Sequence, residues 1–402
     1  MRTAVIGGGA AGFFLAINLK ERMPEMEVTI LERADRVLRK VEVSGGGRCN
    51  CTNTFEGVKD LSAVYPRGHR LMKRLFRQFD YRDAYAWFER HGVRLTVQDD
   101  HCVFPASQDA RTIIDCFTEA CQRLKIRVRT GCKIETLDAL ADYDYIAVTT
   151  GGQPRITGLQ WLADMEHDIE APVPSLFTFQ VNDVVLTRLM GLVVEDTAVM
   201  IPGTKYRASG PLLITHWGMS GPSILRLSSY AARHLHEHGY RCLLSVNWLG
   251  KNENEVAAAL NDFITRNPQK QVTTLPPFPL PNRLWEYLAQ KSIGDKALRR
   301  WAETGKKERN QLVNVLCNDT YDISGKGAFK EEFVTCGGVA LTSVNPNTLE
   351  SRVSPRLYFA GEILDIDGIT GGFNFQAAWT TAYTAAIAIA ESASVVHHFS
   401  EK

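Results

Sequence analysis

The sequence predicts a protein of the α/β class in which one domain is split by a long insertion. Three observations support this prediction. A short apolar strand meets a glycine-rich turn and a helical pattern at the start of the chain. A second strand, which runs into a glycine and a carboxylate, lies near the other end in residues 357–362. Between them, residues 172–217 show short alternating runs with Gly and Pro, which is typical of antiparallel strands.

The first elements form a strand–turn–helix–strand unit. Residues 3–7 are rich in β-formers, an apolar helical pattern runs to about Lys20, and residues 27–32 form the second strand. Further along, the apolar periodicity predicts amphipathic helices over 70–91 and 109–125. This order is typical of a parallel sheet that is covered by helices.

The turn after the first strand carries the spacing Gly7-x-Gly9-x-x-Gly12. Gly7 permits a tight turn, Gly9 lets the backbone approach a pyrophosphate, and Gly12 lets the helix pack close to the sheet. Glu32 follows at the end of the next strand, where a carboxylate can accept hydrogen bonds from both adenosine ribose hydroxyls. The strand before, the helix after and the acid beyond together predict dinucleotide binding.

The element near the C-terminus distinguishes FAD from NAD. The strand 357–360 ends in Gly361 and Glu362, and residues 371–374 then open a helix. In two-dinucleotide-fold flavoproteins such an element holds the ribityl chain, and a helix N-terminus stabilises negative charge on the flavin pyrimidine. A Rossmann-type NAD enzyme needs no such distant element, and the chain has no second Gly-x-Gly-x-x-Gly.

Composition excludes several classes of protein. The 402 residues include 46 Lys+Arg and 45 Asp+Glu, so the net charge of +1 creates no general attraction to nucleic acid or to a membrane. No apolar run reaches the roughly 18 residues that a membrane span requires. The nine cysteines are scattered without a CxxC pair, and no secretion signal is evident. We therefore expect reduced thiols, a cytoplasmic location and no membrane partner.

Together these motifs resemble the BaiN/YhiN-like family of bacterial NAD(P)/FAD-dependent oxidoreductases, also described as aminoacetone-oxidase-like flavoproteins. The resemblance covers nearly the whole chain, and it departs at Pro211, where most relatives are expected to have Glu. The motifs that carry it are residues 7–12 with Glu32, residues 44–53, Thr335-x-Gly337-Gly338-Val339, Thr215-His216-x-Gly218-x-Ser220-Gly221-Pro222, and the segment from Gly361 to Gln376.

The resemblance implies a glutathione-reductase-like FAD-binding domain, interrupted by a β-barrel-like domain that carries a small helical insert. The implied FAD-binding domain comprises residues 1–183 and 330–402, and the barrel comprises 184–252 and 315–329. The helical insert would be residues 253–314.

The resemblance also implies which residues hold FAD, and no metal site is expected. The fingerprint would hold the ADP half, the glycine loop would lie along the pyrophosphate or flavin, and the C-terminal motif would face the ribityl chain and isoalloxazine. The expected FAD-binding residues are Gly7, Gly9, Ala10, Ala11, Gly12, Glu32, Arg33, Lys40, Gly46, Gly47, Arg48, Ile134, Gly151, Gly361, Glu362, Gly372, Phe373 and Asn374.

The loop expected over residues 39–54 holds two further kinds of side chain. Arg48 can pair with a phosphate or position a substrate carbonyl, and the alternative is a salt bridge at a domain edge. Cys49 and Cys51 can be read as a redox pair. Their CxC spacing strains a disulfide, so we favour buried or incidental thiols.

The inserted segment offers one catalytic candidate. His216 has a side chain suited to proton donation, although a helix start nearby, with Ser220 as N-cap and Pro222 in the first turn, explains the motif without catalysis. Asp365 and Asp367 lack the further ligands of a calcium loop, so we interpret them as carboxylates that cap backbone N–H groups or line the flavin site.

The leading functional hypothesis is a cytoplasmic FAD-dependent oxidoreductase. Hydride would pass through flavin N5 between NAD(P)H, which would bind transiently, and a small organic substrate. The first alternative is an amine or amino-ketone oxidase that passes electrons to oxygen. The second is a flavin-dependent tRNA-modifying protein, which the near-neutral charge disfavours although residues 67–77 are locally basic.

Overall fold

The computed structural model describes residues 1–327 and 334–400, with side chains to residue 396. The chain forms two compact units. We call Met1–Val173 together with Val334–Lys402 the terminal unit, and Pro174–Phe333 the inserted unit. The expected boundary at 329/330 lies outside the described residues.

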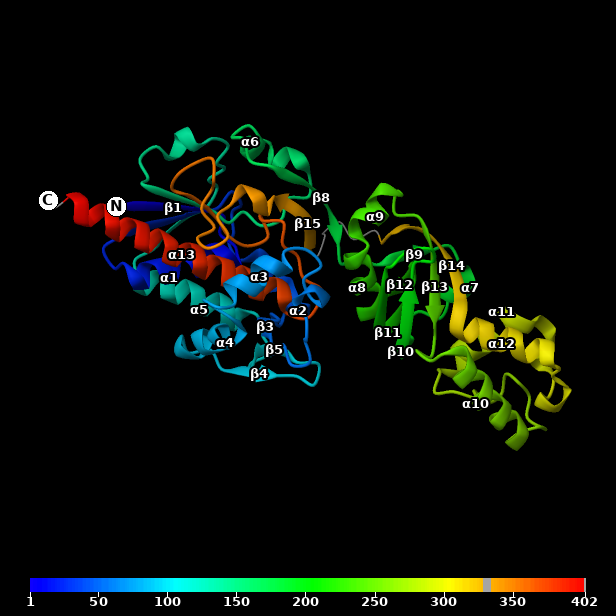
Figure 1. Cartoon of the computed structure of the whole chain (residues 1–402). Coiled ribbons are helices and arrows are strands. Elements are labelled where there is room, and N and C mark those ends of the chain that lie inside the picture. The colour runs from blue at the N-terminus through cyan, green and yellow to red at the C-terminus, as the bar shows by residue number, and fades with distance from the viewer. Residues whose placement is uncertain (328–333, 401–402) are drawn as a thin grey trace. The chain divides into compact units, whose positions relative to one another are not determined.

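The terminal unit is built on a five-stranded parallel sheet in the order β16-β7-β1-β2-β6 (Figure 1). The central strand β1 is buried because its residues are covered on both sides, as is usual in parallel sheets. The strands are β1 (Arg2–Ile6), β2 (Glu27–Leu31), β6 (Arg127–Arg129), β7 (Tyr145–Val148) and β16 (Leu357–Phe359).

Helices α1 (Ala10–Arg22) and α13 (Phe373–Ser400) pack on each other although they come from opposite ends of the chain (Figure 1). Aromatic side chains form the core between them and their neighbours, with Phe14 4.5 Å from Trp87 and 5.1 Å from Trp379 between ring centroids. The other α-helices and strands of this unit are α2 (Arg39–Gly47), α3 (His69–Leu75), α4 (Tyr81–Arg90), α5 (Arg111–Arg123), α6 (Gln160–Ala163), β3 (Thr52–Asn53), β4 (Leu95–Val97), β5 (Cys102–Pro105) and β15 (Val334–Val339), and β8 (Ile169–Ser175) runs across the boundary at Val173.

Two local expectations need correction. The single helix expected over 70–91 is two helices, α3 and α4, because Asp80 begins a new helix with a capping box to Asp83. The loop expected over 39–54 begins as helix α2, which is distorted by non-helical dihedrals from Ser44 to Gly46. The helix expected over 109–125 is found as α5.

The inserted unit contains a closed six-stranded barrel in the order β10-β11-β12-β9-β14-β13 (Figure 1). The paired strands are antiparallel, which agrees with the alternating runs of the sequence. The strands are β9 (Phe179–Val181), β10 (Val193–Met200), β11 (Arg207–Thr215), β12 (Gly218–Ser220), β13 (Cys242–Asn247) and β14 (Asp319–Lys326).

The helices α10 (Glu253–Arg266), α11 (Asn282–Ile293) and α12 (Lys306–Asn318) lie between β13 and β14 in the chain. They share one apolar core with the barrel, to which Trp285 and Trp301 contribute fully buried rings. The buried carboxylate of Asp319 joins the two parts, because it accepts bonds from Lys291 of α11 and Trp248 of the barrel. The remaining helices of this unit are α7 (Val184–Thr187), α8 (Pro222–Tyr230) and α9 (Ala232–Glu237).

The barrel includes a strand that lies before the expected boundary at residue 184. Strand β9 pairs with β12 and β14, although the sequence places it at the end of the implied FAD-binding domain. A strand of three residues carries too little pattern to show which sheet it joins. None of the described helices has a stretch that is both long and apolar enough to traverse a bilayer.

Candidate functional site

The glycines of the turn between β1 and α1 differ in what surrounds them. Gly7 has a φ of 113°, and a Cβ on it would collide with the carbonyl oxygen of Thr149. A Cβ on Gly12 would collide with the carbonyl oxygen of Gly7. By contrast, no atom of the described residues lies within 4 Å of the place where a Cβ on Gly9 would stand. Packing therefore requires Gly7 and Gly12, whereas Gly9 leaves space open at the start of α1.

The N-terminus of α1 is suited to an anion. Gly9 is its N-cap, no side chain in the described residues caps it, and its first turn contains no acidic residue. Its first residues Ala10 and Ala11 are small, so the backbone can be approached closely. The unsatisfied N–H groups and the positive end of the helix dipole can therefore attract the phosphates of a dinucleotide.

Glu32 stands across from this turn at the end of β2. Its carboxylate accepts hydrogen bonds from the backbone N–H groups of Gly8, at 2.7 Å, and Ala34, at 2.8 Å. These bonds fix the carboxylate beside the glycine turn, as the fingerprint predicts, and each oxygen keeps further lone pairs for ribose hydroxyls. Arg33 is exposed next to it.

The segment that leads to Ile134 runs along the same strand end. The N–H of Cys132 donates to the carbonyl of Glu32, and the N–H of Gly131 donates to Ala34. This arrangement brings the part of the chain expected to meet adenine next to the expected ribose ligand.

A second group of expected residues converges where β7 and β16 end. The Lys40 ammonium lies 2.8 Å from a carboxylate oxygen of Glu362, whose other oxygen accepts from the N–H of Thr335 at 2.9 Å. Burial alone would raise the pKa of Glu362, but Lys40 and the backbone donors of Thr335 and Gly152 outweigh it and lower that pKa. Glu362 is therefore an anion at neutral pH.

Gly361 connects this group to the fingerprint. A Cβ on Gly361 would lie 2.8 Å from the Cβ of Ala11, so the two backbones approach closely at the start of α1. A Cβ on Gly151 would meet only Glu362, at 3.9 Å. Residues from both ends of the chain thus line one edge of the sheet, the carboxyl edge at which α/β folds bind ligands.

The glycine loop contributes an exposed backbone and one cation. Gly46 and Gly47 have φ values of 70° and 83°, and around Gly46 a Cβ would meet nothing within 4 Å. Arg48 lies with its guanidinium 4.3 Å from the Phe104 ring centroid and donates to Gly45 and Gln108. Its partners among the described residues are uncharged, so the salt bridge considered as an alternative is not formed there.

The C-terminal motif packs tightly on strand β3 at Thr52. A Cβ on Gly372 would collide with the carbonyl of Thr52, so this backbone contact requires glycine. Phe373 is buried, with its ring centroid 5.1 Å from that of Phe55. The Asn374 amide exchanges hydrogen bonds with the backbone of Gly368. The side chains of Phe373 and Asn374 therefore shape this motif, and any contact with FAD stays a prediction.

The sequence did not single out the ion pair between Arg67 and Asp367. Asp367 is fully buried, and both of its carboxylate oxygens accept hydrogen bonds from Arg67. Burial disfavours the charged guanidinium and by itself would lower the pKa of Arg67. The negative charge and the hydrogen bonds of Asp367 act in the opposite direction, and the pKa of Arg67 is raised. The pair joins two segments that lie about 300 residues apart in the chain. Asp367 is therefore an ion-pair partner, a role that the sequence analysis did not consider when it interpreted this carboxylate as a backbone cap or as part of the flavin site.

The CxC residues are buried free thiols. Their sulfur atoms lie 3.9 Å apart, and burial raises the pKa of the Cys51 thiol. Because a thiolate is the reactive form, the raised pKa of Cys51 and the burial of both thiols favour the interpretation as buried or incidental thiols over a redox relay.

The catalytic candidate His216 lies in the inserted unit, in the turn between β11 and β12. It is exposed, and its ring centroid is 4.1 Å from that of Trp217. Helix α8 does begin with Pro222 in its first turn, but its N-cap is Gly221 rather than Ser220. Gly221 has a φ of 91°, and a Cβ there would lie 2.8 Å from the backbone of Pro211. The role of His216 stays a prediction.

The parallel sheet, the glycine turn and the residues gathered at its carboxyl edge define a Rossmann-type flavoprotein of the oxidoreductase class. The chain belongs to the HI0933-like protein Rossmann domain family, whose model matches residues 1–388. This match confirms the family resemblance found in the sequence.

Among proteins of known function, the chain is similar to two kinds of enzyme. It is 27% identical to a 3-dehydro-bile acid delta(4,6)-reductase of Clostridium scindens, over 97% of this chain and 99% of the relative. It is 26% identical to a ribosomal RNA dihydrouridine synthase of Escherichia coli, over 95% and 96%, and to one of Haemophilus influenzae, over 96% and 97%.

Solved structures agree with the fold. The 3-ketosteroid delta1-dehydrogenase of Sterolibacterium denitrificans matches with a TM-score of 0.53 at 10% identity, over 97% of this chain and 99% of that chain. The expected α/β class with a barrel-like inserted domain is thereby confirmed.

Proposed function

We propose that this chain binds FAD along the carboxyl edge of the terminal sheet and reduces an organic substrate with hydride from NAD(P)H. The observation that carries the proposal is the open space at Gly9, in front of an uncapped helix N-terminus and beside Glu32. A pyrophosphate between two nucleosides fits these donors, because N–H groups face the anion and a carboxylate faces the ribose.

Different residues would hold the two halves of FAD. Gly9, Ala11, Gly12 and Glu32 would hold the ADP half, and Gly361 with Glu362 would hold the ribityl side. When bound, FAD supplies hydride transfer through N5 of its isoalloxazine ring. Lys40 keeps Glu362 ionised, and that carboxylate is positioned to accept hydrogen bonds from ribityl hydroxyls.

The substrate class follows from what the named relatives have in common. A delta(4,6)-reductase and a dihydrouridine synthase both add hydrogen across a carbon–carbon double bond. In a 3-keto steroid and in uracil that bond is conjugated to a carbonyl. We propose that this chain likewise reduces a conjugated carbon–carbon double bond, in a small molecule.

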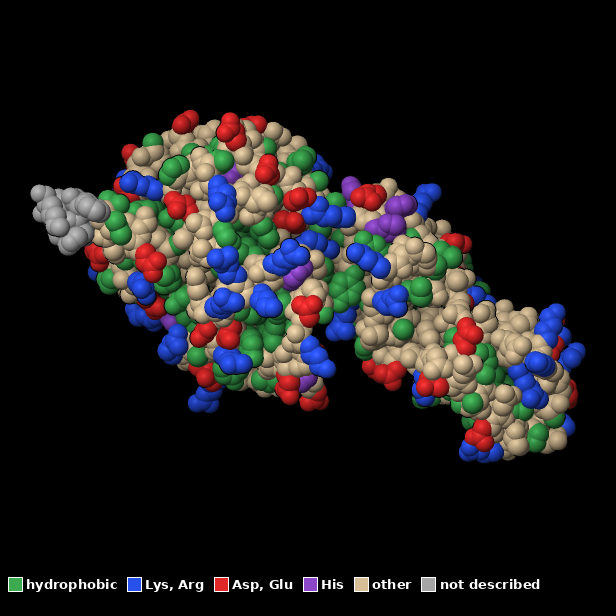
Figure 2. All heavy atoms as spheres, viewed as in Figure 1, with side chains coloured by type: hydrophobic (Ala, Val, Ile, Leu, Met, Phe, Trp, Pro, Cys, Tyr) green, Lys and Arg blue, Asp and Glu red, His purple; other side chains and the backbone are tan. Residues whose placement is uncertain are grey.

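A second candidate substrate is a uracil base in RNA. It is favoured by four exposed cations on and just after α3, over which Lys and Arg side chains gather in Figure 2. These cations, spaced along one short helix, can contact successive phosphates, even though the net charge of the chain is only +1. The four residues are Arg70, Lys73, Arg74 and Arg77.

Anaerobic stopped-flow spectroscopy of the purified flavoprotein tests this proposal. NADH or NADPH should bleach the flavin absorbance, and a cyclic enone should restore it faster than buffer does. Flavin that neither nucleotide reduces, together with peroxide formation from amines, would contradict it in favour of an oxidase. Restoration by RNA transcripts, with dihydrouridine detected after nuclease digestion, would select the second candidate.

A further inference from the structure

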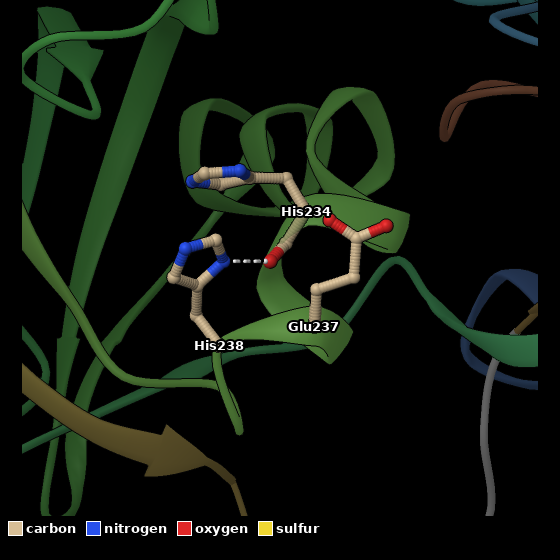
Figure 3. Close-up of side chains that lie close together, drawn as sticks. All are labelled: His234, Glu237 and His238. Carbon is tan, nitrogen blue, oxygen red and sulfur yellow. Dashed lines mark hydrogen bonds between the residues drawn. The ribbon is translucent and has the colours of Figure 1, made fainter.

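The short helix α9 on the inserted unit carries a cluster of three side chains that the redox site does not use. His234 and Glu237 lie in its last turn, and His238 is the C-cap residue that follows it (Figure 3). One ligand atom of each lies within 4.8 Å of the other two. The spacing of three and four residues places the three side chains next to each other on a helix.

The hydrogen bond of His238 prepares its ring for a metal ion. Its Nδ1 lies 2.8 Å from the carbonyl oxygen of His234, as the dashed line in Figure 3 marks. A carbonyl can only accept, so Nδ1 is the donor in this bond and Nε2 is the nitrogen left for a metal ion. Metal-binding histidines commonly have their second nitrogen held in this way, which fixes the tautomer and the orientation of the ring.

The two imidazole rings lie side by side, with centroids 4.3 Å apart. His234 is half-buried, and its ring is 5.6 Å from that of Tyr206, whereas Glu237 and His238 are exposed. One ligand is therefore restrained by packing and another by its hydrogen bond, whereas Glu237 is an exposed side chain. Binding would bring the three ligand atoms from within 4.8 Å of one another to the roughly 2.0–2.2 Å that imidazole and carboxylate ligands take around zinc.

We propose that His234, Glu237 and His238 form a binding site for one divalent transition-metal ion of the zinc class. Two imidazole nitrogens and one carboxylate favour Zn²⁺, Co²⁺ or Ni²⁺, whereas Mg²⁺ and Ca²⁺ require mostly oxygen ligands. Three protein ligands leave a coordination position for water. The ion links residues 234 and 238 across the C-terminal turn of α9, so its binding stabilises that turn.

The matched control is His236, which lies between the proposed ligands in the chain. Its Nδ1 is 3.0 Å from the Tyr240 hydroxyl, and it is not part of the cluster. The change His236→Gln therefore removes an imidazole from the same helix without removing a ligand. The three proposed ligands lie in the inserted unit, and none of them is among the residues proposed to hold FAD.

Zinc titration of the tag-free, chelator-treated full chain against a chromophoric chelator tests the proposal. The wild type and His236→Gln should bind one Zn²⁺ at this site, and its binding should weaken about tenfold or more in His234→Gln and His238→Gln. Zn²⁺ should also raise the melting temperature of the wild type and of the control by mass action, but not that of the ligand variants. Unchanged circular dichroism and flavin content check that each variant folds.

Two results would overturn the site. One is equal zinc affinity in the wild type and in the double variant His234→Gln/His238→Gln. The other is an equal loss of affinity in His236→Gln. Glu237→Gln provides a second test in case a histidine variant folds poorly, because it changes only an exposed carboxylate. Unchanged zinc affinity in this variant would show that Glu237 is not a ligand.

Discussion

The terminal unit brings residues from distant parts of the chain to one edge of an open parallel sheet, whereas the strands of the inserted unit close into a barrel. At the open edge, the strands end in glycine-rich turns, where backbone N–H groups are not used for pairing with other strands. In the barrel, the described strands pair around a continuous apolar core. The difference teaches that the open edge, where the sheet ends, offers backbone groups to the proposed cofactor, whereas the barrel strands use theirs on one another.

In each unit the described residues include a buried aspartate, and the two are held differently. Asp367 of the terminal unit is paired with Arg67, whose side chain is only 15% exposed. Asp319 of the inserted unit accepts from Lys291, which is 31% exposed, and also from Trp248 and Tyr321. Losing the cation should therefore matter more in the terminal unit.

The largest expected effect comes from a glycine that packing requires. Gly12→Ala should lower the free energy of unfolding by about 3 kcal/mol or more, because the new Cβ would overlap the carbonyl oxygen of Gly7. Urea denaturation of the full chain measures the loss. A variant as stable as the wild type would show that α1 can move away from the sheet at no cost.

The next effect separates the two buried carboxylates. Arg67→Ala should destabilise the chain by about 3 kcal/mol, since it leaves the Asp367 charge in the protein interior without its guanidinium. Lys291→Ala should cost about 1 to 2 kcal/mol, because Trp248 and Tyr321 still donate to Asp319. The same denaturation experiment compares them, and the reverse order would contradict this account of the two units.

A smaller and pH-dependent effect is expected at Glu362. Because its pKa is lowered in the folded protein, its contribution to stability is present above the ordinary glutamate pKa of about 4.3 and is lost as pH falls through the lowered value. Glu362→Gln should therefore cost about 1 kcal/mol at neutral pH, and the difference from wild type should shrink on acidification. Thermal melts across pH measure it, and a difference that grows in acid would be inconsistent with the Lys40 pairing.

The smallest effect on stability is expected at Gly9, where a methyl group meets open space. Gly9→Ala should change the free energy of unfolding of the flavin-free chain by less than about 0.5 kcal/mol, yet weaken FAD binding about tenfold or more. Gly305, the N-cap of α12 in the inserted unit, has similar backbone dihedrals and provides the control. Gly305→Ala should leave FAD affinity unchanged in fluorescence titrations. Equal weakening of FAD binding by both variants would contradict the specific role of Gly9.

Local patterns in the sequence predicted the fingerprint because Gly7, Gly9, Gly12 and Glu32 act through short-range geometry. The closeness of Lys40 to Glu362 depends on the order of strands in the sheet, so their pairing could not be derived from either segment alone. The Arg67–Asp367 pair was missed for the same reason. One signal was available, because two aspartates in an Asp-x-Asp-Gly turn without further metal ligands need another positive partner if they are buried.

Other misses were local choices that several residues could satisfy. Either Ser220 or Gly221 suits the start of α8, and the strained backbone conformation of the glycine decided between them. The run 70–91 has helical periodicity throughout, but α3 ends at Leu75 and the capping box at Asp80 begins α4. In both cases the deciding signal was local, but a competing local pattern also fitted the sequence.

The most direct test of the central claim is the flavin content of the purified chain. After expression with riboflavin available, the account predicts a flavin absorbance spectrum and about one FAD per chain on mass spectrometry of the denatured supernatant, with much less in Gly9→Ala. A folded wild-type chain that contains no flavin and gains none on incubation with FAD would contradict it.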